Sequence, residues 1–194
     1  MRYCALLCLC LAAYPAAAQI SLQSSRCYVL DAQWQTDAQF HIRLPEEPLA
    51  ALRSGISLFF RLSIEEAGAQ WWQSPRRLAV QEWHLDYNHL SQSYVLQQGA
   101  QTPLPFGDVD SALKALGSIE QLPLDKRKRD TPIMLRMQLS QAQLPFALRL
   151  NALFFAQWTL DSGSLPCQLS NRAASAKARP SARFFSASAA QSAS

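Results

Sequence analysis

Residues 56–65, Ile-Ser-Leu-Phe-Phe-Arg-Leu-Ser-Ile-Glu, place an apolar side chain at every second position. The even-numbered positions are all Ile, Leu or Phe, and the odd-numbered positions are polar except Phe59. Successive side chains of a β-strand point to opposite faces of the sheet. The segment therefore predicts a strand with one face in a core and the other in solvent. Half-buried strands of this kind are typical of antiparallel sheets.

Further segments repeat this alternation, and we expect each of them to form a strand. They are residues 79–87, 94–96, 133–139, 146–150 and 156–160, together with two N-terminal segments at 28–34 and 40–44. The run Gln35-Thr36-Asp37 is interpreted as the turn between the two N-terminal strands, and the polar run 88–91 as the turn that follows residue 87.

Two short helices are expected between the strands. The first runs from about Glu46 to Ser54, because Pro48 lies in the first turn and Gly55 offers a C-terminal cap. The second runs from about Val109 to Leu116, with Asp108 as its N-cap. These elements predict a β-rich α+β domain with antiparallel sheets in a sandwich-like arrangement and two short helices.

Residues 1–18 have the three regions of an export signal. Arg2 supplies a positive charge, residues 3–14 are apolar, and small residues precede a cleavage site between Ala18 and Gln19. We expect a protein that is exported to the periplasm or secreted; the alternative is an uncleaved leader that tethers the protein to the inner membrane. Residues 19–170 are expected to form a single domain, and the Ala/Ser-rich basic residues 171–194 a disordered tail.

The net charge of +4 belongs mainly to the two ends of the chain. Removing Arg2 and the four basic residues of the tail leaves 13 basic against 14 acidic side chains in the body. A near-neutral body argues against nucleic acid as a partner, since such a partner requires a basic face. Two cysteines, Cys27 and Cys167, remain outside the leader. In an oxidising compartment they either form a disulfide or remain two buried thiols, and the sequence leaves both alternatives open.

No residue pattern predicts a catalytic or metal site. The three histidines, His41, His84 and His89, have no cysteine or paired carboxylate at metal-ligand spacing. The sequence contains no Gly-x-Ser-x-Gly motif, and its six glycines form no phosphate-binding loop. We therefore expect no metal, no cofactor and no enzymatic activity.

Two loops are candidate contact surfaces. Trp71 and Trp72, followed by Arg76 and Arg77, lie between two predicted strands. Aromatic and Arg side chains are enriched at interface hot spots, and Trp also suits membrane surfaces; the alternative is that both Trp side chains pack into the core. The basic run at 126–129 is interpreted as a solvated loop, with an anion or partner contact as the alternative.

Three stretches taken in order resemble a known family. They are Leu-Ala-Ala-Leu-Arg-Ser-Gly-Ile-Ser-Leu-Phe-Phe at 49–60, Leu-Asp-Tyr-Asn-His-Leu-Ser-Gln-Ser-Tyr at 85–94, and Leu-Arg-Met-Gln-Leu-Ser-Gln-Ala-Gln-Leu-Pro at 135–145. Over roughly residues 26–160 the chain is similar to domain-of-unknown-function family 4390, an exported proteobacterial family. The resemblance implies an envelope protein with no established activity or ligand. Genes of such proteins often lie beside a gene for a nitrogen-regulation-type sensor histidine kinase, which implies a membrane sensor kinase as a partner.

The leading hypothesis is a non-enzymatic periplasmic module that binds a protein or the membrane surface through the loop at residues 71–77. An envelope enzyme with an unrecognised site is the alternative, and a deep polar pocket lined by Asp86, His84 or His89 would favour it. A purely structural envelope component is a third hypothesis. The sequence identifies no small-molecule ligand.

Overall fold

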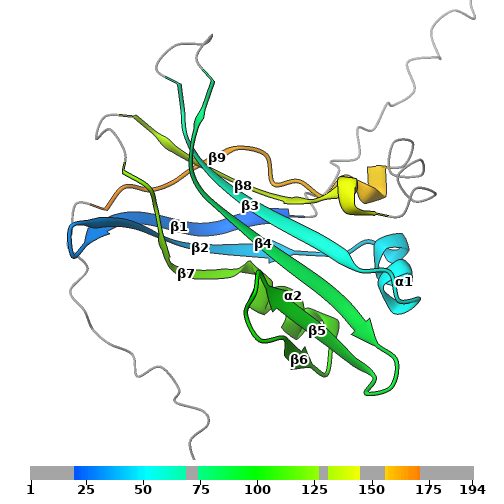
Figure 1. The fold of residues 1–194 in the computed structure, drawn as a ribbon. Helices are drawn as coiled ribbons and strands as arrows, with labels where there is room; N and C mark the ends of the chain where they lie inside the picture. Colours follow the sequence, from blue (N-terminus) through cyan, green and yellow to red (C-terminus); the bar gives the residue numbers. More distant parts are fainter. Residues whose placement is uncertain (1–19, 69–73, 127–130, 145–155, 171–194) are drawn as a thin grey trace, which may run out of the picture.

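The computed structural model describes residues 20–68, 74–126, 131–144 and 156–170, and its strands form two antiparallel sheets (Figure 1). One sheet has three strands in the order β1-β2-β7, and the other has six in the order β6-β5-β4-β3-β8-β9. The strands are β1 (Ile20–Leu30), β2 (Gln33–Ile42), β3 (Leu58–Glu66), β4 (Arg76–Asn88), β5 (Ser93–Gln98), β6 (Leu104–Phe106), β7 (Ser118–Pro123), β8 (Ile133–Leu139) and β9 (Leu165–Pro166). The helices are α1 (Glu46–Arg53) and α2 (Val109–Gly117), with two short 3-10 helices, η1 (Gln141–Gln143) and η2 (Ala156–Trp158). The β-rich, two-sheet fold predicted from the sequence is confirmed.

The strand predicted over residues 56–65 is β3, where buried and half-buried residues alternate along the whole strand. β3 lies between β4 and β8, and Phe60 pairs with Trp83 on one side and with Leu139 on the other. All three side chains are buried. Because burying one large apolar side chain contributes about 1.5–3 kcal/mol, a shift of register that exposed this row would be costly. Within the described ranges no helix is both long and apolar enough to span a bilayer.

The first hairpin turns earlier than the sequence predicts. β1 and β2 are joined at Asp31 and Ala32, whose φ angles of 50° and 63° are both positive, as a type I′ turn requires. The turn predicted at 35–37 is wrong, because these residues lie inside β2. The buried Thr36 hydroxyl donates to the Arg26 carbonyl oxygen at 3.2 Å. The polar side chains of residues 35–37 therefore make contacts within the sheet and do not form a turn.

Both predicted helices are present. α1 is followed by Gly55 with φ of 91°, a conformation that glycine adopts without steric cost. Asp108 caps α2, because its Oδ1 accepts from the Ser111 N–H at 2.7 Å. α2 contacts β2 and β7 of one sheet and β5 and β6 of the other. α1 lies at one end of the sandwich, beside η2 (Figure 1).

The strand predicted over 156–160 is wrong, because η2 occupies residues 156–158. Trp158 is 2 % exposed, and its Nε1–H donates to Glu47 Oε2 of α1 at 3.1 Å. The Trp158 indole is thus buried by packing near α1. The alternation of apolar residues over 156–160 arises here without strand pairing. The strand predicted over 146–150 lies outside the described residues, as do the leader and the tail.

Candidate functional site

β3 and β4 flank the loop predicted as a contact surface, and their described ends extend beyond the neighbouring strands at the top of Figure 1. Arg76 and Arg77 begin β4, and both are exposed. In the β3–β4 ladder, Arg76 lies opposite Glu66 and Arg77 lies opposite Glu65. Trp71 and Trp72 lie outside the described residues, so the structure presents only the two arginines of this surface. In the basic run at 126–129, Lys126 is described and exposed, and residues 127–129 lie outside the described ranges.

His84, Asp86 and Ser57 come together on the outer face of the six-stranded sheet. His84 Nε2 lies 3.1 Å from Asp86 Oδ2, and its ring stacks on Phe59 with centroids 4.3 Å apart. The Ser57 hydroxyl donates to the other oxygen of Asp86. The carboxylate thus stands between the hydroxyl and the imidazole, whereas nucleophilic catalysis needs the imidazole beside the hydroxyl. The three side chains form a cross-strand polar cluster, and the grooves described below are lined by other residues.

The remaining histidines lie apart from this cluster. His89 lies in the β4–β5 turn, with its ring 5.0 Å from that of Tyr87. Asn88 builds this turn, because its Oδ1 accepts from the N–H groups of the two residues after His89 at 2.9 and 3.2 Å. His41 lies on the exposed side of β2. Among the described residues, no group of three or more His, Cys, Asp or Glu side chains is arranged to hold a metal ion.

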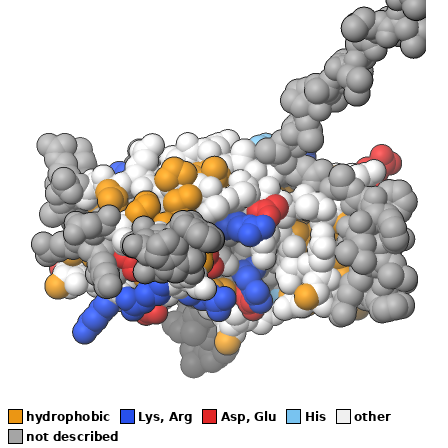
Figure 2. Space-filling model, turned by 90° about the horizontal axis from the view of Figure 1, so that it is seen from above, with side chains coloured by type: hydrophobic (Ala, Val, Ile, Leu, Met, Phe, Trp, Pro, Cys, Tyr) orange, Lys and Arg blue, Asp and Glu red, His pale blue; other side chains and the backbone are white. Residues whose placement is uncertain are grey.

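Charged side chains on the outer sheet face are paired across strands. Arg61 contacts Glu82 at 2.6 Å, and Arg136 binds both carboxylate oxygens of Asp161. The hydrogen bonds from Arg136 lower the pKa of Asp161. Figure 2 shows basic and acidic side chains next to one another on the face seen from above. This mixing agrees with the near-neutral charge of the body.

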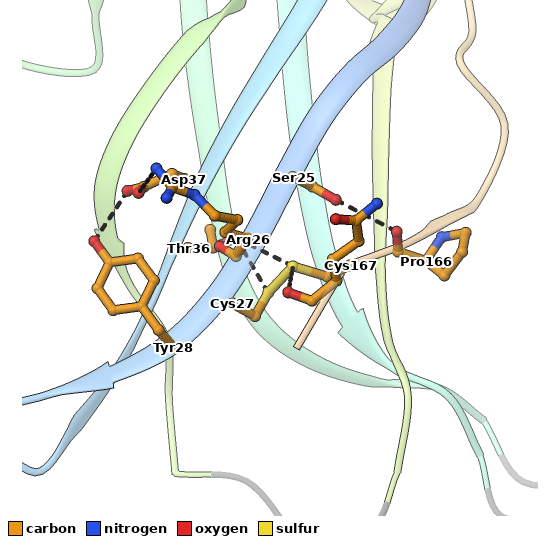
Figure 3. Close-up of a disulfide and its surroundings, with 9 residues drawn as sticks. Ser25, Arg26, Cys27, Tyr28, Thr36, Asp37, Pro166 and Cys167 are labelled. Carbon is orange, nitrogen blue, oxygen red and sulfur yellow. Dashed lines mark hydrogen bonds and ion pairs between the residues drawn. A yellow bond between two sulfur atoms is a disulfide. The ribbon is translucent and has the colours of Figure 1, made fainter. Parts of the chain in front are cut away.

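The C-terminal part of the described chain joins the two sheets at one edge (Figure 3). β9 pairs with β8 of the six-stranded sheet, and further along Leu169 bridges to Cys27 of β1. The Cys27 N–H donates to the Gln168 carbonyl oxygen at 2.8 Å, and the Cys27 carbonyl accepts from the Ser170 N–H at 2.9 Å. We call residues 165–170 together with Cys27 the clasp.

Within the clasp, Cys27 and Cys167 form a disulfide, which is one of the two alternatives that the sequence leaves open. Their Cα atoms are 6.0 Å apart, and they are separated by 140 positions in the chain. Both cysteines are buried, and the Thr36 hydroxyl lies 3.2 and 3.6 Å from the two sulfurs. A buried bridge that closes so long a loop stabilises the fold by restricting the unfolded chain. Such bridges persist in oxidising compartments, so the disulfide is consistent with an extracytoplasmic location.

Asp37 links the three strands of the smaller sheet beside the clasp (Figure 3). Its carboxylate accepts from the Tyr28 hydroxyl at 3.0 Å and from the Gln121 N–H at 2.9 Å, and it lies 3.6 Å from the Arg26 guanidinium. Burial, followed by the hydrogen bond to Asp37, raises the pKa of Tyr28. These residues line a polar cleft of about 320 Å³. Because the Asp37 carboxylate already accepts hydrogen bonds from β1 and β7, we interpret its contacts as structural.

A larger groove, of about 690 Å³, opens between α1, α2 and the end of β2. We call it the α1–α2 groove. Its floor is apolar and consists of Phe40, Ile42, Leu44, Leu49, Val109 and Leu113. Its rim is polar and carries His41, Arg43, Asp110 and Lys114. Leu44, Leu49 and Val109 are only half-buried, so they present apolar surface to a ligand.

One wall of the groove is the end of β2. β1 pairs with β2 as far as Ile42, whereas β7 pairs with it only from Gln35 to Gln39. α2 lies close to β2 where the β7 pairing stops, because a Cβ on Gly117 would be 2.3 Å from the Phe40 carbonyl oxygen. Only glycine permits this approach. The last residues of β2 thus have a strand on one side and the groove on the other.

The sequence predictions miss this groove, and of the residues they single out for chemistry only His41 lines it. One indication is present in the sequence: Val109 and Leu113 share the apolar face of the predicted second helix. The described residues of the groove offer an apolar floor with a mixed, net basic rim, and no nucleophile–base pair lies among them. The groove is suited to binding.

Comparison with known proteins identifies the family and no close relative. The family model described as "Domain of unknown function (DUF4390)" matches residues 17–166, which is more than half of the chain. No curated protein and no solved structure matches the chain significantly.

Proposed function

Because the chain belongs to the DUF4390 family, whose description assigns no activity, we propose a function from the geometry: the domain is a non-enzymatic binding module that holds a protein partner in the α1–α2 groove. The observation that carries this proposal is the groove itself, with its apolar floor and polar rim. Binding sites in proteins are typically concave and apolar, with a few polar groups that fix orientation.

The compartment forms part of the proposal. The buried Cys27–Cys167 disulfide and the expected export signal both fit a protein that works in the periplasm or outside the cell. The partner is then another envelope protein, and the membrane sensor kinase implied by the family resemblance is one candidate. The Ser57–Asp86–His84 cluster adds support to a non-enzymatic role, because its hydroxyl donates to a carboxylate and not to the imidazole.

A second candidate surface is the end of the β3–β4 hairpin. Arg76 and Arg77 are adjacent and exposed on a hairpin that extends beyond its neighbours. Two exposed arginines suit an anionic partner, such as an acidic protein or an anionic lipid surface. The described residues of this surface, Arg76 and Arg77, offer charge, whereas the described lining of the α1–α2 groove offers apolar side chains as well, so we place the main contact at the groove.

Site-specific photocrosslinking tests the proposal. A photoreactive phenylalanine analogue replaces Lys114 at the groove rim, Arg76 on the hairpin, or Val80 on the outer sheet face, where the native side chain is 39 % exposed. In bacterial envelope extract we expect a discrete adduct from position 114 and none from position 80. An adduct from position 76 alone would move the contact to the hairpin, and the absence of an adduct from all three positions would contradict the proposal.

A further inference from the structure

We propose that the α1–α2 groove takes an extended peptide segment with alternating apolar side chains and at least one acidic side chain, and that this segment adds to the free edge of β2 as a further strand. The inference rests on the proposed function, because it specifies the partner segment and its mode of binding at the same groove.

The first support is the direction of the β2 backbone. The carbonyl of Phe40 faces Gly117 on the β7 side of the strand. In an antiparallel strand the N–H and C=O of one residue point to the same side of the strand. This side alternates from one residue to the next, so residues two positions apart point the same way. The backbone groups of Ile42 are therefore directed to the β7 side as well, where the β7 pairing has already stopped at Gln39. Within the described ranges, Ile42 forms no backbone hydrogen bond to α2 or to a residue outside the sheet.

The second support is the apolar surface along this edge. Leu44 and Leu49 flank the end of β2, and Val109 lies across from them at the start of α2. All three are half-buried. An added strand places every second side chain on one face, so alternating apolar side chains would cover these three residues. Strand addition of this kind combines backbone hydrogen bonds for affinity with side-chain pockets for specificity.

The third support is the charge of the rim. Arg43 and Lys114 are basic, and among the described residues that line the groove Asp110 is the only acidic one. A basic excess in the rim complements an acidic side chain in the segment. Both basic side chains are exposed, so this attraction is expected to weaken as salt is added.

An acyl chain is the competing occupant of a groove with an apolar floor and a basic rim. An acyl chain has no donor or acceptor along its length, so it would leave the N–H and C=O of Ile42, a residue that is only 6 % exposed, without partners. Burying unpaired peptide groups costs free energy, whereas a peptide strand satisfies them. The free strand edge therefore favours a peptide.

The test begins with a displayed library of random heptapeptides, which is selected on the full chain without counter-selection, and the enriched peptides are then titrated against Val109→Asp. Val109 is the first residue of α2, where an acidic side chain is tolerated by the helix. Lys114→Glu on the exposed side of α2 is a second groove variant, and Val80→Asp on the outer sheet face is the matched control. We expect enriched peptides to alternate apolar residues and to carry an acidic residue. Their affinity should fall about tenfold or more with Val109→Asp, about threefold or more with Lys114→Glu, and not with Val80→Asp.

Backbone N-methylation of the best peptide separates strand addition from other modes of binding. Ile42 is the last residue of β2 and Gly117 already lies against the Phe40 carbonyl, so one peptide amide donates to β2, at the Ile42 carbonyl. Methylation of that amide should weaken binding about tenfold, and methylation of the other amides should have little effect. Equal weakening of binding by methylation at every peptide position, with binding still reduced by Val109→Asp, would overturn strand addition and leave the proposed function standing.

The remaining outcomes are also decisive. If no peptide is enriched, or if enriched peptides bind Val109→Asp as well as the native protein, the peptide proposal is overturned. If palmitate binds the native protein and Val109→Asp abolishes that binding while no peptide is enriched, the groove takes an acyl chain, and both this inference and a protein partner at the groove are wrong.

Discussion

The two ends of the β1–β2 hairpin are built from the same pair of strands but are covered differently. At Cys27, β1 has β2 on one side and the clasp on the other, with hydrogen bonds to Gln168 and Ser170 and a disulfide to Cys167. At Ile42, β2 has β1 on one side and the α1–α2 groove on the other. In the proposed function, the clasp end serves stability and the groove end receives the partner.

This comparison makes the two ends separable by mutation. Changes at the clasp should alter the free energy of unfolding and leave groove binding intact. Changes at the groove wall should alter both, because α2 belongs to the core as well as to the groove, with Leu113 and Leu116 buried.

The largest expected effect comes from removing the disulfide with Cys27→Ala and Cys167→Ala together. A native bridge that closes a long loop contributes about 2–5 kcal/mol to the free energy of unfolding. Denaturant titration of the native and variant proteins measures this loss. A reductant should destabilise the native protein to a similar extent and leave the variant unchanged. A loss below about 1 kcal/mol would contradict the role of the clasp, and a tenfold weaker groove affinity in the folded variant would show that the two ends are coupled.

A smaller loss is expected from Gly117→Ala at the contact between α2 and β2. The added methyl group would meet the Phe40 backbone, which cannot move aside as a flexible side chain can. Overpacking of this kind costs about 1–3 kcal/mol, and the displacement of α2 should also weaken groove binding. Gly107→Ala is the matched control, because nothing lies within 4 Å of its Cβ position. Equal stability of the two variants, measured by thermal unfolding, would refute the close approach of α2 to β2.

The smallest effect is expected on the outer sheet face near the clasp, from Arg136→Gln. Hydrogen bonds from Arg136 lower the pKa of Asp161 in the folded protein. A lowered folded pKa means that the ion pair stabilises the fold above the unfolded value of about 4 and that this contribution is lost as pH falls through the folded value. Since Arg136 is exposed and Asp161 is only half-buried, solvent screens the pair, and the variant should lose less than about 1 kcal/mol at pH 7.

The check on this ion pair is a pH series of unfolding curves. The curves of the native protein and Arg136→Gln should converge only as the pH falls through the lowered pKa of Asp161 in the folded native protein, because the carboxylate is protonated in both proteins below that value. A difference that persists at low pH would assign the effect to lost packing of the Arg136 side chain and not to its charge.

Local patterns identified the fold class, both helices and the central strands, but they did not predict β6, β7, β9 or the first part of β1. Strict alternation identified β3 and β8, and the caps at Asp108 and Gly55 identified the helix ends. The predictions failed where a local pattern was overridden by a distant contact. Thr36 looked like a turn residue but donates to Arg26 across the hairpin, and the segment around Trp158 looked like a strand but is held by Glu47.

The groove was not predictable for a related reason. Its apolar floor includes Leu44, Leu49 and Val109, which no single pattern connects, and the groove begins where β7 stops pairing with β2 at Gln39. The point at which β7 stops pairing with β2 depends on the position of α2. The sequence indicates that position only through Gly117, whose missing Cβ allows α2 to approach β2 closely. The predicted loop at residues 71–77, by contrast, was found from composition alone, and its contact role remains a prediction.

Amide hydrogen exchange, recorded with and without the selected heptapeptide, tests the central claim most directly. The selection does not favour any one surface, so the measurement reports where a partner segment binds. We expect new protection at residues 40–44 and 109–114, including the Ile42 amide, and no change around Cys27. New protection at Arg76 and Arg77 without any at residues 40–44 would contradict the assignment of the groove as the binding site.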